Sequence, residues 1–121
     1  MRLLAAGCVL LAFAGIAAAQ DDDPMAPRYG NTLIVKNAEG QEARMFYNAD
    51  HTYTGTMMDS AVVKGVWVLA EGKLCVEQIE PKPPANIPNP RCRKFEMHNV
   101  GDTWEIDTPN GKITASIVSG R

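Results

Sequence analysis

From residue 32 onward, apolar and polar residues alternate over short stretches that are separated by turn residues. The stretch 52–57 alternates strictly, with Tyr53, Gly55 and Met57 on one side and threonines on the other. Alternation with a period of two over short stretches predicts half-buried β-strands. No stretch beyond the N-terminal apolar run keeps a period of 3.6 residues, so the chain is predicted to be all-β.

Eight strands are predicted, at residues 32–36, 42–48, 52–57, 62–70, 73–79, 91–99, 103–108 and 112–118. The clearest hairpin signal is Asn110-Gly111, since these residues adopt the positive φ angles that a type I′ turn needs. Regularly spaced short strands indicate an antiparallel up-and-down meander. Eight strands suffice for such a sheet to curl around a narrow interior. We therefore expect one domain over residues 31–121, a small closed or partly open β-barrel.

The first 19 residues have the pattern of a secretory signal peptide. A basic start, Met1-Arg2, precedes the apolar run 3–18, which is short for a membrane span. Ala17-Ala18-Ala19 supplies the small residues of a cleavage site. A lipoprotein signal ending at Cys8 is an alternative, but cleavage there would leave almost no apolar region. We expect cleavage near Ala19 and a periplasmic or secreted protein without a membrane span.

Residues 20–30 contain the acidic run Asp21-Asp22-Asp23 and two prolines, and they are predicted to form a disordered N-terminal tail. The whole chain has 12 basic and 14 acidic residues. The expected cleavage removes Arg2 and no acid, which leaves a formal net charge of −3. This mild, unpatterned charge argues against nucleic acid or an anionic membrane surface as the partner.

Two cysteines, Cys75 and Cys92, remain after cleavage, and two cysteines in an exported chain usually pair. Cys75 has the opposite parity to Leu74 and Val76, which are expected to face the core, and Cys92 also falls on a polar face. This parity predicts a cross-strand disulfide on the outside of the sheet. A metal site or a redox pair would call for a CxxC spacing or a nearby histidine, which the sequence lacks.

Arg93 departs from this pattern because it has the inward parity of Phe95 and Met97. Two explanations stay open. Either a bulge at the start of the strand turns Arg93 outward, or the side chain points into the end of a cavity and binds an anionic group.

The segment 80–90 contains five of the eight prolines, so it cannot be a strand. We predict a stiff, extended loop whose ends are tied by the disulfide. It is either an insertion without a role of its own, or a lid or partner-facing loop.

Inward-facing aromatic and methionine side chains are the main candidates for a ligand site. They either fill the barrel or, if the interior is open, line a pocket for a small apolar or aromatic ligand. The candidates for this lining are Tyr53, Met57, Trp67, Phe95, Met97 and Trp104, with Tyr47 and Arg93 as polar anchors. The two histidines, His51 and His98, stand alone in the sequence. No catalytic residue, metal ligand or cofactor is predicted.

The segment Phe46-Tyr47-Asn48-Ala49-Asp50-His51-Thr52-Tyr53 is followed by Gly65-Val66-Trp67, by Gly72-Lys73-Leu74-Cys75 and by Cys92. This order resembles the pattern F-x-x-D-G-T-Y … G-x-W … G-x-L-C … C of small periplasmic β-domains of proteobacteria, over residues 42–95. Asp-His replaces the Asp-Gly of that pattern. The resemblance implies a lipocalin-like or avidin-like meander and carries no established activity.

A second similarity is to periplasmic inhibitors of secreted metalloproteases. They also have about eight strands, one disulfide and a Gly-x-Trp element before the first cysteine, as small β-barrels often do. In those inhibitors this element lies near the mature N-terminus, and the N-terminal tail enters the protease. Here three predicted strands precede Gly65.

These features predict an exported periplasmic β-barrel that acts as a non-enzymatic binding or accessory protein. Its partner would be a small apolar or aromatic ligand or another periplasmic protein. One alternative is a periplasmic protease inhibitor acting through its tail or the loop 80–90. A second is a small β-barrel enzyme of the isomerase or cyclase type. An open interior would favour ligand binding, and a filled one would move the function to the outer surface.

Overall fold

The computed structural model describes residues 23–121, so the predicted signal peptide lies outside the described residues. A short 3-10 helix, η2 (Ala26–Arg28), precedes the sheet. The strands are β1 (Thr32–Lys36), β2 (Glu42–Tyr47), β3 (Thr52–Thr56), β4 (Val62–Ala70), β5 (Lys73–Glu80), β6 (Arg91–Lys94), β7 (Thr103–Thr108) and β8 (Gly111–Val118). The prediction of an all-β fold of eight strands is confirmed.

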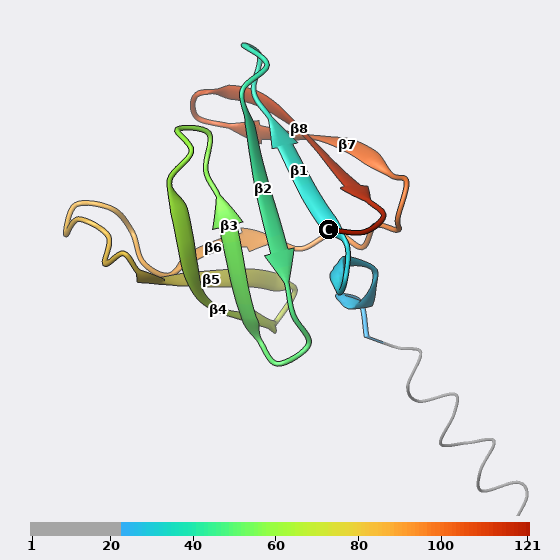
Figure 1. Cartoon of the computed structure of the whole chain (residues 1–121), viewed down its shortest axis with the longest axis horizontal. Coiled ribbons are helices and arrows are strands. Elements are labelled where there is room, and N and C mark those ends of the chain that lie inside the picture. Colours follow the sequence, from blue (N-terminus) through green and yellow to red (C-terminus); the bar gives the residue numbers. More distant parts are fainter. Residues whose placement is uncertain (1–22) are drawn as a thin grey trace, which may run out of the picture.

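All eight strands belong to one antiparallel sheet with the order β6-β5-β4-β3-β2-β1-β8-β7. The sheet curls so that β5 and β6 cross behind β3 and β4, while β7 and β8 turn away behind β1 (Figure 1). Strands β6 and β7 are the two edge strands of the sheet. The predicted barrel is therefore partly open, and the opening lies between β6 and β7.

The alternation of buried and exposed residues along β4 identifies the side chains that face the concave side of this half-barrel. Val63, Gly65 and Trp67 are buried, whereas the residues between them are exposed. The register between β4 and β5 shifts at Gly65, which pairs with Gln78 while the preceding residue pairs with Glu80. A Cβ atom at Gly65 would overlap the Glu77 carbonyl oxygen, so only glycine allows β5 to approach so closely.

Strand β6 is shorter than predicted, because it ends at Lys94 and not at residue 99. Its neighbour β5 begins at Lys73, the partner of Lys94, so the ladder has no further strand to pair with. The next amide, that of Phe95, donates instead to the carbonyl of Gly72 in the β4–β5 turn, at 2.9 Å. Residues 95–102 form an irregular connection to β7.

The predicted disordered tail over 20–30 is wrong for residues 23–30, while residues 20–22 lie outside the described part of the chain. Met25 is fully buried, and Tyr29 forms a β-bridge with Tyr47. The Asp23 carboxylate accepts hydrogen bonds from the Met25 amide at 2.9 Å and from the Tyr29 hydroxyl at 2.8 Å. The acidic, proline-containing composition of this segment indicated disorder, although Met25 packs into the core. The helix η2 therefore packs below β1 as part of the domain (Figure 1).

One end of the half-barrel is closed by a buried cluster of Met25, Leu33, Tyr47, Tyr53, Val63, Trp67, Ala115 and Ile117. The Trp67 indole donates its N–H to the carbonyl of Asn48 at 3.0 Å and stacks on His51 with ring centroids 4.1 Å apart. The only polar atom of this large side chain is thus paired, which makes its burial favourable.

The part of the chain that the structure describes, residues 23–121, has no helix with the length and hydrophobicity of a membrane span.

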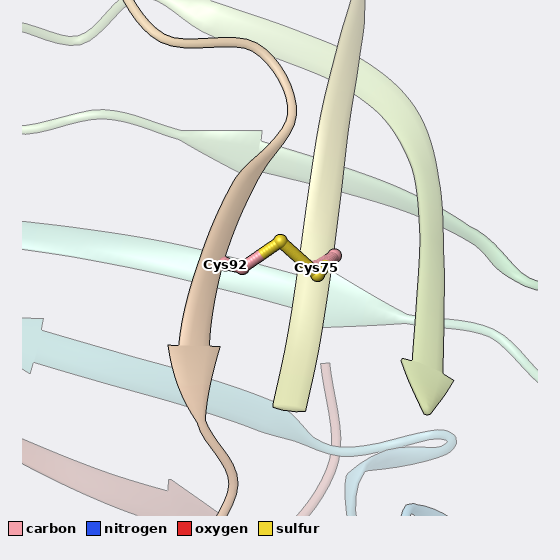
Figure 2. Close-up of a disulfide and its surroundings, with 2 residues drawn as sticks. All are labelled: Cys75 and Cys92. Atoms are coloured by element: carbon pink, nitrogen blue, oxygen red, sulfur yellow. A yellow bond between two sulfur atoms is a disulfide. The ribbon is translucent and has the colours of Figure 1, made fainter. Parts of the chain in front are cut away.

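The predicted disulfide is confirmed. Cys75 and Cys92 are direct partners in the β5–β6 ladder, with Cα atoms 4.0 Å apart (Figure 2). Both residues have the opposite parity to Leu74, which contacts the core. The bond closes the loop 81–90, which extends from the side of the sheet (Figure 1). The Asn89 side chain fixes the end of this loop by two hydrogen bonds to the backbone of Gln78, at 2.8 and 3.1 Å.

Candidate functional site

The concave face beyond the closed end forms an open groove of about 850 Å³. Its floor is largely aliphatic and comes from strands on both sides of the curl, with Leu33, Val35, Met45, Leu74, Val76 and Ile106 among the lining side chains. Pro88 and Pro90 at the end of the proline-rich loop border the groove on the β6 side. The interior is thus filled at one end and open at the other.

Six of the eight predicted lining residues are brought together in this groove: Tyr47, Tyr53, Met57, Arg93, Phe95 and Trp104. Trp67 is not among the lining residues, and it lies in the buried cluster at the closed end, where it stacks on His51. Met97 is not among them either, and its side chain is 63% exposed. Its inward parity was inferred from a strand that stops at Lys94, so the alternation does not extend to it.

Arg93 lies opposite Leu74 in a ladder that stays regular from Arg91 to Lys94. The explanation that a bulge turns Arg93 outward is therefore wrong. Arg91 lies opposite Val76 in the same ladder. Because residues directly opposite each other share a face of the sheet, both arginines belong to the concave face with these two aliphatic residues. Both line the groove.

Arg28, in η2, is a lining residue that the sequence did not indicate. It is only 7% exposed, and its Cζ atom lies 5.3 Å from the ring centroid of Phe95 and 5.8 Å from that of Tyr47. Among residues 23–121 its guanidinium forms no ion pair. Burial lowers the pKa of Arg28, and the neighbouring Tyr47 opposes that effect. The sequence did not indicate Arg28 as a lining residue because it lies in a segment that was predicted to be disordered.

Tyr47 lines the groove beside Arg28, whose Cζ atom lies 5.8 Å from its ring centroid. Burial of its hydroxyl raises the pKa of Tyr47, and the positive charges of Arg28, Arg93 and Arg91 oppose that rise. Three guanidinium groups from two separate parts of the chain therefore act on one phenol. Burial likewise raises the pKa of Tyr53, against the charge of Arg91.

Three acidic residues also line the groove. Glu96, Glu105 and Asp107 are exposed lining residues. Two of them are engaged by Lys112, which lies 3.4 Å from Glu105 and 4.0 Å from Asp107. The groove thus combines an apolar floor with basic groups from η2 and β6 and acids from β7 and from the segment that follows β6.

The two histidines do not line the groove. His51 stacks on Trp67, and His98 stacks on Trp104 with ring centroids 3.6 Å apart. Residues 23–121 contain no cluster of three or more His, Cys, Asp or Glu side chains that could hold a metal ion. The groups that face the groove are suited to binding, since they offer apolar contact and fixed positive charge.

No family of proteins, no curated protein and no solved structure matches this chain in sequence or fold comparisons.

Proposed function

We propose that this protein is exported to the periplasm and acts there as a non-enzymatic binding protein whose groove takes up a small apolar or aromatic ligand. The observation that carries the proposal is the open, largely aliphatic groove of about 850 Å³. Pockets for small ligands have volumes of this order and are lined mainly by apolar side chains. Export is supported by the signal-peptide pattern of residues 1–19 and by the Cys75–Cys92 disulfide.

Two features favour binding over the other hypotheses. An inhibitor that inserts its tail into a protease needs a free N-terminal segment, whereas Met25 and Arg28 are buried against the half-barrel. A general acid or base in the groove would have to be a tyrosine, Lys94 or a rim carboxylate, since neither histidine lines it. No observation specifically favours inhibition through the loop 81–90 or an isomerase activity.

The test is a titration with a neutral apolar probe, N-phenyl-1-naphthylamine, whose fluorescence rises on transfer from water to an apolar site. We expect saturable binding at one site per chain. Val76→Trp, which fills the groove, should weaken that binding by at least about tenfold. The matched control is Val68→Trp, since Val68 lies on the adjacent strand with its side chain 51% exposed on the convex face. Absence of saturable binding, or equal loss in both variants, would contradict the proposal.

A further inference from the structure

The buried guanidinium of Arg28 is the starting point. Transfer of a charged group out of water is costly unless a partner of opposite charge compensates for it. Contacts with the faces of Tyr47 and Phe95 offset part of this cost. Among residues 23–121, no carboxylate lies within ion-pair distance of Arg28. A guanidinium has five N–H donors, so Arg28 keeps donor capacity at the surface of the groove.

Two further arginines face the same space from another part of the chain. Arg93 and Arg91 project from alternate positions of β6 onto the concave face, opposite Leu74 and Val76. Neither forms an ion pair within the described residues. Their charges and that of Arg28 all act on the hydroxyl of Tyr47. The chain as a whole has more acids than bases, whereas the groove is lined by four basic residues, including Lys94, and three acidic ones.

We infer that the ligand of this groove is an amphipathic organic acid, whose carboxylate binds Arg28 between the Tyr47 and Phe95 rings and whose apolar body lies on the aliphatic floor. Arg93 and Arg91 supply additional positive charge on the β6 side. The inference rests on the proposed function, since it names the class of ligand for the same groove. A planar guanidinium matches a carboxylate through two parallel hydrogen bonds, which makes this pair strong and specific.

A single negative charge fits the groove better than a dianion. Glu96, Glu105 and Asp107 also line the groove, and Glu96 follows Arg93 by only three residues in the sequence. A phosphate monoester would bring up to two negative charges close to these acids, and like charges repel each other. The arrangement therefore favours a carboxylate over a phosphate on the same apolar chain.

The experiment compares matched ligands by isothermal titration calorimetry, with decanoate, decanol and decyl phosphate as one set and indole-3-acetate and indole-3-acetamide as another. We expect an acid to bind about 10- to 100-fold more tightly than its neutral counterpart, the range that charged hydrogen bonds supply. Decyl phosphate should bind more weakly than decanoate. Arg28→Met should abolish the preference for the acid and leave the affinity for decanol nearly unchanged.

Arg44→Met is the matched control, because Arg44 is exposed on β2 with the opposite parity to the buried Ala43. It should keep the full preference for the acid. If Arg28→Met does not fold, the double variant R91M/R93M gives the same comparison, with a reduced preference expected. Equal binding of acid and alcohol, a preference retained in Arg28→Met, or tighter binding of decyl phosphate would overturn the inference and leave the proposed function standing. If neither acid nor neutral ligand binds, the proposed function itself fails.

Discussion

Cys75 and Cys92 lie directly opposite each other in the β5–β6 ladder, and their disulfide fixes the register that brings Arg91 and Arg93 onto the concave face. Strand β6 has only four residues and lies at the end of the sheet, so it pairs with β5 alone. An edge strand this short gains little from backbone pairing. The disulfide therefore stabilises the position of Arg91 and Arg93 in the groove as well as the fold.

The first prediction concerns this cross-link. Cys75→Ala combined with Cys92→Ala should lower the free energy of unfolding by about 3 kcal/mol, the chain-entropy value for a loop of this length. Urea denaturation followed by circular dichroism measures the change. The double variant should also bind decanoate more weakly, because β6 then loses its fixed register. An unchanged denaturation midpoint would show that β6 is held by other contacts.

The second prediction concerns the close approach of β4 and β5. Gly65→Ala should lower the free energy of unfolding by about 3 kcal/mol or more, because the added methyl group meets the backbone carbonyl of Glu77. The matched control is Gly55→Ala, where the nearest atom is the flexible Met45 Sδ at 2.7 Å. That variant should lose about 1 kcal/mol, since methionine adapts to new neighbours. Similar losses in both variants would contradict the bulge geometry at Gly65.

The strand pattern was predictable because alternation is a local property of the chain. The strand at Val62–Ala70 and the strand at Thr103–Thr108 have the predicted bounds, and the side of Cys75 followed from parity alone. The end of β6 depends on where β5 begins. No residue within 91–99 indicates that position. The roles of Met25 and Arg28 depend on η2 meeting a barrel end that is built from distant strands. Composition alone made that segment look disordered.

The third prediction tests this N-terminal packing. Met25→Ala should lower the free energy of unfolding by about 2–5 kcal/mol, because the side chain is fully buried in the closed end of the half-barrel. Met97→Ala is the matched control, since that side chain is 63% exposed, and it should change stability by no more than about 0.5 kcal/mol. Chemical denaturation of both variants gives the comparison. Equal, small effects would mean that residues 23–30 do not contribute to the core.

The fourth prediction concerns alkaline pH. Burial and the hydrogen bond to Asp23 raise the pKa of Tyr29 to about 12, and burial also raises the pKa values of Tyr47 and Tyr53. These are all three tyrosines of the chain. Each binds its proton more tightly in the folded state, so the stabilisation is complete below pH ~10 and is lost as pH rises through the folded-state pKa values.

Absorbance at 295 nm should therefore show no tyrosinate until the pH is well above 10, and stability in urea should fall over the same range. The chain unfolded in urea is the control and should titrate near pH 10. The Tyr47→Phe variant should lose less stability between pH 10 and 12 than the unmodified protein. Titration of a folded-state tyrosine near pH 10 would contradict the burial of these hydroxyl groups.

The fifth prediction separates stability from binding at Arg28. Arg28→Met replaces a buried charge, which has no acidic partner among residues 23–121, by an apolar side chain of similar length. Such replacements are neutral or stabilising, so the free energy of unfolding should rise by about 1 kcal/mol or more. Arg28→Lys keeps the charge but loses the planar stacking on Tyr47 and Phe95, and it should be less stable than the unmodified protein.

With decanoate present, the unmodified protein should become more stable than Arg28→Met. A ligand that binds only the folded state at about 100 times its dissociation constant adds about 2.7 kcal/mol to the free energy of unfolding. The unmodified protein should gain this amount, and Arg28→Met should gain much less at the same concentration. Thermal denaturation with and without decanoate measures both effects in one series. If Arg28→Met is less stable without ligand and gains as much from decanoate, the guanidinium supports the fold and not the ligand.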